Sequence, residues 1–308
     1  MLAVSGYAEA ATYSRTSSLS GQSFLDAFHW EAIPDPTNGR VNYVTQSEAQ
    51  SAGLVSVSGF TVTLRGDHTT FLDPSGPGRN SFRLRSNTQY SNHVAIFDIG
   101  HMPEGCGTWP AGEIDIVEGV NNQIPNQSTL HTSASKYFRS HLKGVLNDCD
   151  VWSDGNQGCG VQLADSNSFG PNFNYNGGGW YAVDRSPTYI AIYFWERGST
   201  SVPSQVEYPV DKVDTSTWGT PAAYFPNTNC DFPSHFGPMN FIINLAFCTL
   251  FHVFVGDAPL NFIFAGGDWA GSVYSSSGCP SNCVDFVNKN PSAFSNAYFN
   301  FNALNIYQ

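Results

Sequence analysis

Short runs in which apolar and polar residues alternate recur along the whole chain, and each run ends at a turn-forming sequence. This alternation predicts β-strands, because successive side chains of a strand point to opposite faces. We expect helix only in two short segments, near Gln46–Ala52 and Cys283–Asn288. The pattern predicts an all-β sandwich or barrel. The expected strands are Gly59–Leu64, Ser81–Arg85, His93–Ile99, Glu113–Glu118, Tyr189–Trp195 and Phe241–Phe247.

The composition favours the same architecture. Charged residues make up 12% of the 308 residues, which is about half the usual share of roughly 25%. Aromatic residues make up 14%, and 29 Gly and 18 Pro supply the turns between short strands. The chain contains no internal repeat and no low-complexity linker. We therefore expect residues 11–308 to form a single domain.

The formal net charge of −12 narrows the possible partners. Nucleic-acid binding needs clustered Lys and Arg, and anionic membranes repel an acidic surface. A neutral polymer such as a glucan carries no such penalty. No segment looks transmembrane by length and composition. The expected partner is therefore neither nucleic acid nor a membrane, and we expect a monomer.

The seven cysteines favour a disulfide framework in a secreted protein. No pair of C-x-x-C motifs has zinc-site spacing, so we expect no structural metal. Seven is an odd number, so we expect at most three disulfides and one free thiol. Ala8-Glu9-Ala10 has the form of a signal-peptide cleavage site, and residues 1–10 are interpreted as a signal-peptide remnant or a flexible N-terminus.

Three acids within six residues form the most informative cluster, in the stretch Gly112–Gly119. Glu113 and Asp115 share one face of a strand, and one β-bulge near Ile116–Val117 would bring Glu118 to the same face. Retaining glycoside hydrolysis needs two carboxyl groups about 5–5.5 Å apart, and repulsion from Asp115 would help to keep one of them protonated. An exposed strand edge with solvated acids, or a calcium site, would also accommodate these residues.

This stretch resembles the E-x-D-x-x-E signature of glycoside hydrolase family 16. The similarity runs from near Ala11 to Tyr307, so it covers nearly the whole chain. It implies a concanavalin-like β-jelly-roll sandwich of two antiparallel sheets, with a cleft on the concave sheet. Further segments similar to basidiomycete laminarinase-like members are Gly76–Asn87, His101–Pro110, Gly178–Asp184, Trp218–Pro226, Gly267–Gly271 and Val284–Val287.

The resemblance also implies an activity, a substrate and a set of roles. The substrate would be a β-1,3- or mixed β-1,3-1,4-glucan, cut internally with retention and without a cofactor. Each residue also has a structural alternative, since a Trp in a sandwich is commonly core and a lone His in a strand is commonly a satisfied structural group. The implied roles are nucleophile for Glu113, assistant for Asp115, acid/base for Glu118, glucan stacking for Trp109 and Trp269, a place near the reacting sugar for His131, and a place beside the cleft for Arg83.

Three segments depart from the family pattern. Trp109 runs through Pro-Ala-Gly straight into Glu113, where family members have a further strand with another substrate Trp. Residues 133–147 do not resemble the family's cysteine-containing loop, which makes Cys149 the expected free thiol. Residues 249–266 form an atypical insertion, which we interpret as an intron translated in frame; a genuine insertion folded under a loop is the alternative.

These departures leave three hypotheses for function. The first is a retaining endo-β-1,3(4)-glucanase. The second is a transglycosylase of the same family, which uses the same acids but transfers the glycosyl group to a sugar. The third is a glucan-binding form that is catalytically impaired because a cleft strand is missing.

Overall fold

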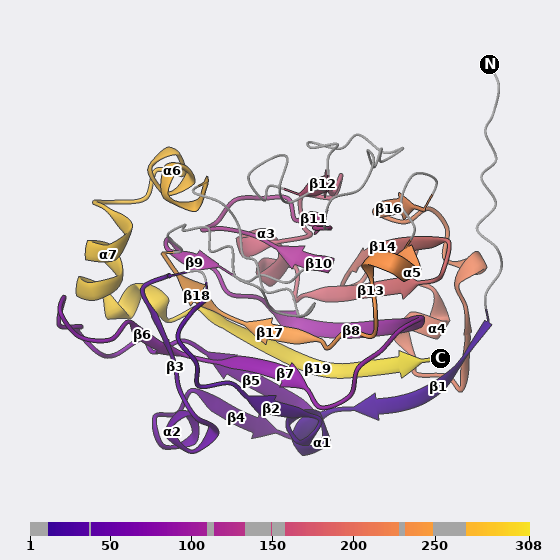
Figure 1. Ribbon diagram of the computed structural model, residues 1–308, viewed down its shortest axis with the longest axis horizontal. Helices are drawn as coiled ribbons and strands as arrows, with labels where there is room; N and C mark the ends of the chain where they lie inside the picture. The colour runs from indigo at the N-terminus through magenta and orange to yellow at the C-terminus, as the bar shows by residue number, and fades with distance from the viewer. Residues whose placement is uncertain are drawn as a thin grey trace.

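The computed structural model describes residues 12–36, 38–109, 114–132, 149, 158–227, 232–248 and 269–308, without the side chains of residues 109, 233 and 269–272. Antiparallel strands dominate this part of the chain, and the helices between them are short (Figure 1). The predicted all-β class is confirmed, and the arrangement matches the jelly-roll of two antiparallel layers.

The larger layer is a nine-stranded sheet built around two long strands, β8 (His93–His101) and β19 (Tyr298–Tyr307), which lie side by side in Figure 1. Its main path runs β15-β1-β19-β8-β13-β14-β16, and β5 adds to β19 and carries β4. The other members are β1 (Thr12–Leu19), β4 (Val55–Ser58), β5 (Thr61–Arg65), β13 (Gly179–Arg185), β14 (Tyr189–Glu196), β15 (Lys212–Asp214) and β16 (Ala223–Pro226).

Shorter strands form four further sheets. The first is three-stranded, in the order β17 (Ile242–Asn244), β7 (Arg83–Ser86) and β2 (Phe28–Trp30). The second pairs β18 (Ala246–Phe247) with β9 (Thr108–Trp109). The third joins β10 (Ile114–Glu118), β11 (Gln127–Leu130) and β12 (Cys159–Gln162). The last is a parallel pair of β3 (Val41–Tyr43) and β6 (Arg79–Ser81).

The hydrophobic core lies between the large sheet and the shorter ones. Phe97 and Ile99 of β8 pack in one buried cluster with Leu84 of β7 and Ile243 of β17. The residues that alternate with them, such as Ile96, belong to a second cluster that includes three tryptophans. Because neighbouring strand residues face opposite ways, the central strands of the large sheet are apolar on both faces. The tryptophans of the second cluster are Trp180, Trp195 and Trp218.

In the described part of the chain, seven short α-helices connect the strands. Both predicted helices are confirmed, and the first begins with a capping box in which the Thr45 side chain and Glu48 satisfy each other's backbone N–H groups. No helix in the described part is long and apolar enough to cross a membrane. The helices are α1 (Gly21–Asp26), α2 (Gln46–Ser51), α3 (Gly170–Tyr175), α4 (Ser204–Glu207), α5 (Phe232–His235), α6 (Trp269–Ser276) and α7 (Cys283–Lys289), with 3-10 turns at Thr215–Thr217 and Pro291–Phe294.

Three disulfides pair six of the seven cysteines: Cys106–Cys279, Cys149–Cys159 and Cys248–Cys283. The prediction that Cys149 is the free thiol is therefore wrong. The prediction assumes a partner in the altered loop, whereas Cys149 pairs with Cys159 at the start of β12. The seventh cysteine, Cys230, lies outside the described residues, as do the segments 133–147 and 249–266.

Candidate active site

The acidic stretch forms β10, which pairs antiparallel with β11 and carries a bulge. Asp115 pairs with Thr129, and the next pair joins Glu118 to Gln127. Three steps along β10 thus oppose two steps along β11, so β10 holds one extra residue. The predicted bulge at Ile116–Val117 is confirmed. It turns Asp115 and Glu118 to the same face of the strand.

Two polar side chains hold the bulge in place. A bulge leaves backbone groups without ladder partners, and a buried backbone group needs a hydrogen bond. The Ile116 carbonyl accepts hydrogen bonds from Asn126 Nδ2 at 2.9 Å and from Ser128 Oγ at 3.0 Å. The Glu118 backbone N–H donates to Asn126 Oδ1 at 2.9 Å. Asn126 therefore bridges the two sides of the extra residue.

Asp115 and Glu118 are both buried, and each has a partner on β11 or directly after it. Thr129 Oγ1 donates a hydrogen bond to Glu118 Oε2 at 2.8 Å, and His131 Nε2 lies 3.2 Å from Asp115 Oδ2. Burial, and then the negative charge of Asp115, raise the pKa of Glu118 to about 8 against the opposing effects of His131 and Thr129. Glu118 therefore keeps its proton at neutral pH, which suits a general acid.

The structure brings together three of the predicted site residues: Asp115, Glu118 and His131. Glu113 lies outside the described residues, one position before β10. The backbone of Trp109 ends β9 and pairs with Ala246, and Trp269 begins α6. The side chains of both tryptophans lie outside the described part, so their stacking role stays a prediction.

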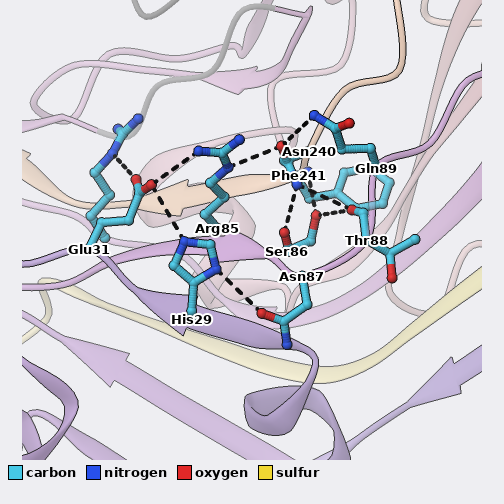
Figure 2. Close-up of polar contacts among 10 residues, drawn as sticks. His29, Glu31, Arg85, Ser86, Asn87, Thr88, Gln89, Asn240 and Phe241 are labelled. Atoms are coloured by element: carbon cyan, nitrogen blue, oxygen red, sulfur yellow. Dashed lines mark hydrogen bonds and ion pairs between the residues drawn. The ribbon is translucent and has the colours of Figure 1, made fainter. Parts of the chain in front are cut away.

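Arg83 lies in a different sheet, on β7, and is buried against an acid that the sequence alone does not single out. Its Nε donates to Glu31 Oε2 at 2.9 Å. Arg85 Nη1 lies 3.6 Å and His29 Nε2 lies 3.7 Å from Glu31 Oε1, and Figure 2 shows these two groups converging on the carboxylate. The shared face predicted for Arg83 and Arg85 is consistent with this common partner.

Further polar side chains, which follow β7 and precede β17 in the chain, extend this group (Figure 2). Arg85 Nε and Gln89 Nε2 donate to Asn240 Oδ1 at 3.0 and 3.2 Å, and His29 Nδ1 lies 3.3 Å from Asn87 Oδ1. Such donors and acceptors suit the hydroxyl groups of a sugar. Among the described residues, no group of His, Cys, Asp or Glu could hold a metal ion.

Comparison with known proteins gives a consistent result. A family model described as "XgeA-like, catalytic GH16 domain" matches residues 28–257 and 260–307. A probable endo-1,3(4)-β-glucanase of Aspergillus niger is 38% identical over 98% of this chain, and a probable glycosidase of Schizosaccharomyces pombe is 35% identical over 97%. The chain spans 41% of the first relative's length and 70% of the second's.

Two solved structures match over nearly the whole chain. Laminarinase 16A from Phanerochaete chrysosporium, in a structure with two 6-O-glucosyl-laminaritriose molecules in donor and acceptor sites, is 48% identical with a TM-score of 0.86. The match covers 97% of this chain and 100% of that one. An elongating family 16 β-1,3-glucosyltransferase is 37% identical with a TM-score of 0.83, over 96% of this chain and 100% of that one.

Proposed function

The chain belongs to glycoside hydrolase family 16, and we propose that it cleaves β-1,3- and mixed β-1,3-1,4-glucans internally and with retention. The observation that carries the proposal is the environment of Glu118. Its carboxyl is buried, has a pKa of about 8, and shares one strand face with Asp115. A carboxylic acid kept neutral beside other acids is the arrangement that a general acid requires.

In the first step, the Glu113 carboxylate attacks the anomeric carbon while Glu118 gives its proton to the glycosidic oxygen. The bond from carbon to that oxygen breaks, the leaving sugar departs with the proton, and a glycosyl ester forms on Glu113. Asp115 acts on this step through its charge, since it helps to hold the proton on Glu118 until the leaving oxygen needs it.

In the second step, Glu118 is ionised and serves as a base. It takes a proton from water, the hydroxyl oxygen attacks the anomeric carbon, and the ester bond to Glu113 breaks. Two inversions at the same carbon give net retention. We assign glucan binding to Trp109 and Trp269, whose indole faces would stack on sugar rings, with Arg83 beside them and His131 near the reacting sugar.

Transglycosylation is a second candidate, favoured by the match to the β-1,3-glucosyltransferase along the whole of that chain. The same two glutamates would act, but a sugar hydroxyl would replace water in the second step. The difference lies in the acceptor site and in water access, not in the acids.

The test uses the purified full chain on laminarin and lichenan. Glu113→Ala should abolish cleavage, and azide should restore part of it with an inverted product, because the small anion replaces the missing nucleophile. Glu207→Ala, at an exposed glutamate of α4, is the control and should leave turnover unchanged. Near-normal turnover by Glu113→Ala would rule out the assignment.

Product analysis with an added acceptor oligosaccharide separates the candidates. Chains longer than the starting glucan would support the transferase. Binding of laminarin without any turnover would support the third hypothesis, an impaired glucan-binding form.

A further inference from the structure

A row of side chains along β11 and directly past its end contacts the two described acids. Gln127 and Thr129 lie two positions apart on one face of the strand, and His131 follows two positions later, one residue after β11 ends. His131 contacts Asp115, as described above, and Thr129 contacts Glu118. Gln127 contacts neither acid directly. Its Nε2 donates to Thr129 Oγ1 at 3.3 Å.

Thr129 Oγ1 takes part in two hydrogen bonds. An amide nitrogen can only donate, so the Thr129 oxygen accepts from Gln127. Thr129 Oγ1 in turn donates its hydroxyl hydrogen to Glu118 Oε2, 2.8 Å away. In a neutral carboxyl group, the oxygen that accepts this hydrogen bond serves better as the carbonyl oxygen than as the protonated one. The proton is therefore left on Oε1 of Glu118.

Two glycines, one on β12 and one directly before it, make room for this row. A Cβ at Gly160 would lie 2.5 Å from Gln127 Nε2, and a Cβ at Gly158 would lie 2.7 Å from His131 Cε1. Both approaches are closer than real Cβ contacts allow. Gly160 pairs with Thr129 across β11 and β12, so the space is beside the row itself.

We propose that Thr129, oriented by Gln127, is a positioning residue that occupies Oε2 of Glu118 and so leaves the transferable proton on Oε1. The proposal rests on the proposed function, because it assumes that Glu118 is the general acid. The bonds that form and break in the reaction are unchanged. Thr129 contributes a fixed hydrogen-bond donor, not a proton to the substrate.

The first test measures the protonation of Glu118 directly, without turnover. Protein labelled with ¹³C at the glutamate carboxyl carbons is titrated by NMR, with Glu118→Gln to assign the signal. Asp115 and His131 are the titratable groups that face Glu118, and both stay in place in every variant. Thr129→Val keeps the side-chain shape and removes the hydroxyl. It should raise the pKa of Glu118 by about one unit, because a donor to the ionised form is lost.

Two companion variants keep this test decisive. Thr129→Ser retains the hydroxyl and should titrate like the wild type. Gln127→Met frees the Thr129 hydroxyl to turn away, so the pKa should rise by less than in Thr129→Val. An unchanged titration in Thr129→Val, or an equal shift in Thr129→Ser, would overturn the proposal, since a packing effect of the methyl group would then explain the result.

The second test compares leaving groups. Thr129→Val should lower kcat on laminarin about tenfold and leave an activated aryl β-glucoside nearly unaffected, because only the poor leaving group needs the proton. Equal losses on both substrates would indicate a structural role alone. Glu118→Gln distinguishes the two levels of failure. If Glu118→Gln loses as much activity on the aryl glucoside as on laminarin, the proposed function fails. If Glu118→Gln loses activity mainly on laminarin but Thr129→Val does not, only this inference fails.

Discussion

The Glu118 carboxyl should make the stability of the protein depend on pH in a way that one substitution removes. Burial and the charge of Asp115 raise the pKa of Glu118 from an ordinary 4.5 to about 8. Between these two values the folded protein holds a proton on Glu118 that the unfolded chain has lost. The free energy of unfolding therefore falls as pH rises through this window. Glu118→Gln has no proton to lose and should escape the fall.

The magnitude follows from the width of the window. Each pKa unit corresponds to about 1.4 kcal/mol, so the whole shift corresponds to about 5 kcal/mol. This contribution is fully present below about pH 4.5 and is lost as pH passes 8. The free energy of unfolding of Glu118→Gln, relative to that of the wild type, should rise by about 1.4 kcal/mol for each pH unit between 5 and 8. Above pH 8 this difference should level off.

The assay is urea denaturation with the disulfides intact, at a series of pH values from 5 to 9. Wild type, Glu118→Gln and the exposed-site control Glu207→Gln are compared. The general repulsion of an acidic chain affects all three proteins alike, so differences between them isolate one site. Parallel curves for wild type and Glu118→Gln across this range would refute the reasoning, because they would show that Glu118 titrates alike in both states.

Three further outcomes are expected. Cleavage of laminarin should decline as pH rises through about 8, where Glu118 loses its proton; an unchanged rate at pH 9 would contradict its role as the acid. Gly158→Ala should reduce turnover by displacing His131, whereas Gly53→Ala, at a similar φ but with nothing within 4 Å, should not; equal effects would point to backbone strain alone. Alkylation of the denatured, unreduced protein should label one thiol, at Cys230, and mass spectrometry that finds no labelled cysteine would exclude this.

The bulge in β10 could be predicted from sequence because it follows from parity alone. Glu113 and Asp115 are two residues apart and Glu118 is three further on, so one extra residue is needed to align them. The side chains that hold the bulge could not be predicted in the same way. Ser128 lies on the partner strand and Asn126 directly before it, and their role depends on the register between β10 and β11.

The longest strand, β19, was not among the expected strands, and its register explains why. Phe299 and Phe301 face the core, but the next core residues are Leu304 and Ile306, which have the opposite parity. The pairing with β8 shifts between Asn300 and Ala303, so the alternation changes phase within one strand. A period of two cannot be followed across such a shift.

The partner of Arg83 shows a different limit. Glu31 lies 52 positions away in the chain, and only the pairing of β2 with β7 brings their side chains to one face. No local pattern contains that pairing. Asp115 and Glu118, by contrast, lie on one strand, and the signature of the family places them together without any structure. The contact between His131 and Asp115 depends on the pairing of β10 with β11.

The extra residue in β10 links the fold to the proposed chemistry. Ile114 and Ile116 pack against the core, while Asp115 lies on the opposite face. Without the bulge, Glu118 would share the parity of the two isoleucines and would face the core with no donor from Thr129. With it, the same carboxyl is still buried enough to stay neutral but lies beside a hydroxyl donor and a second acid. One residue in the strand thus decides whether Glu118 is an uncompensated core carboxyl or an acid placed for proton transfer.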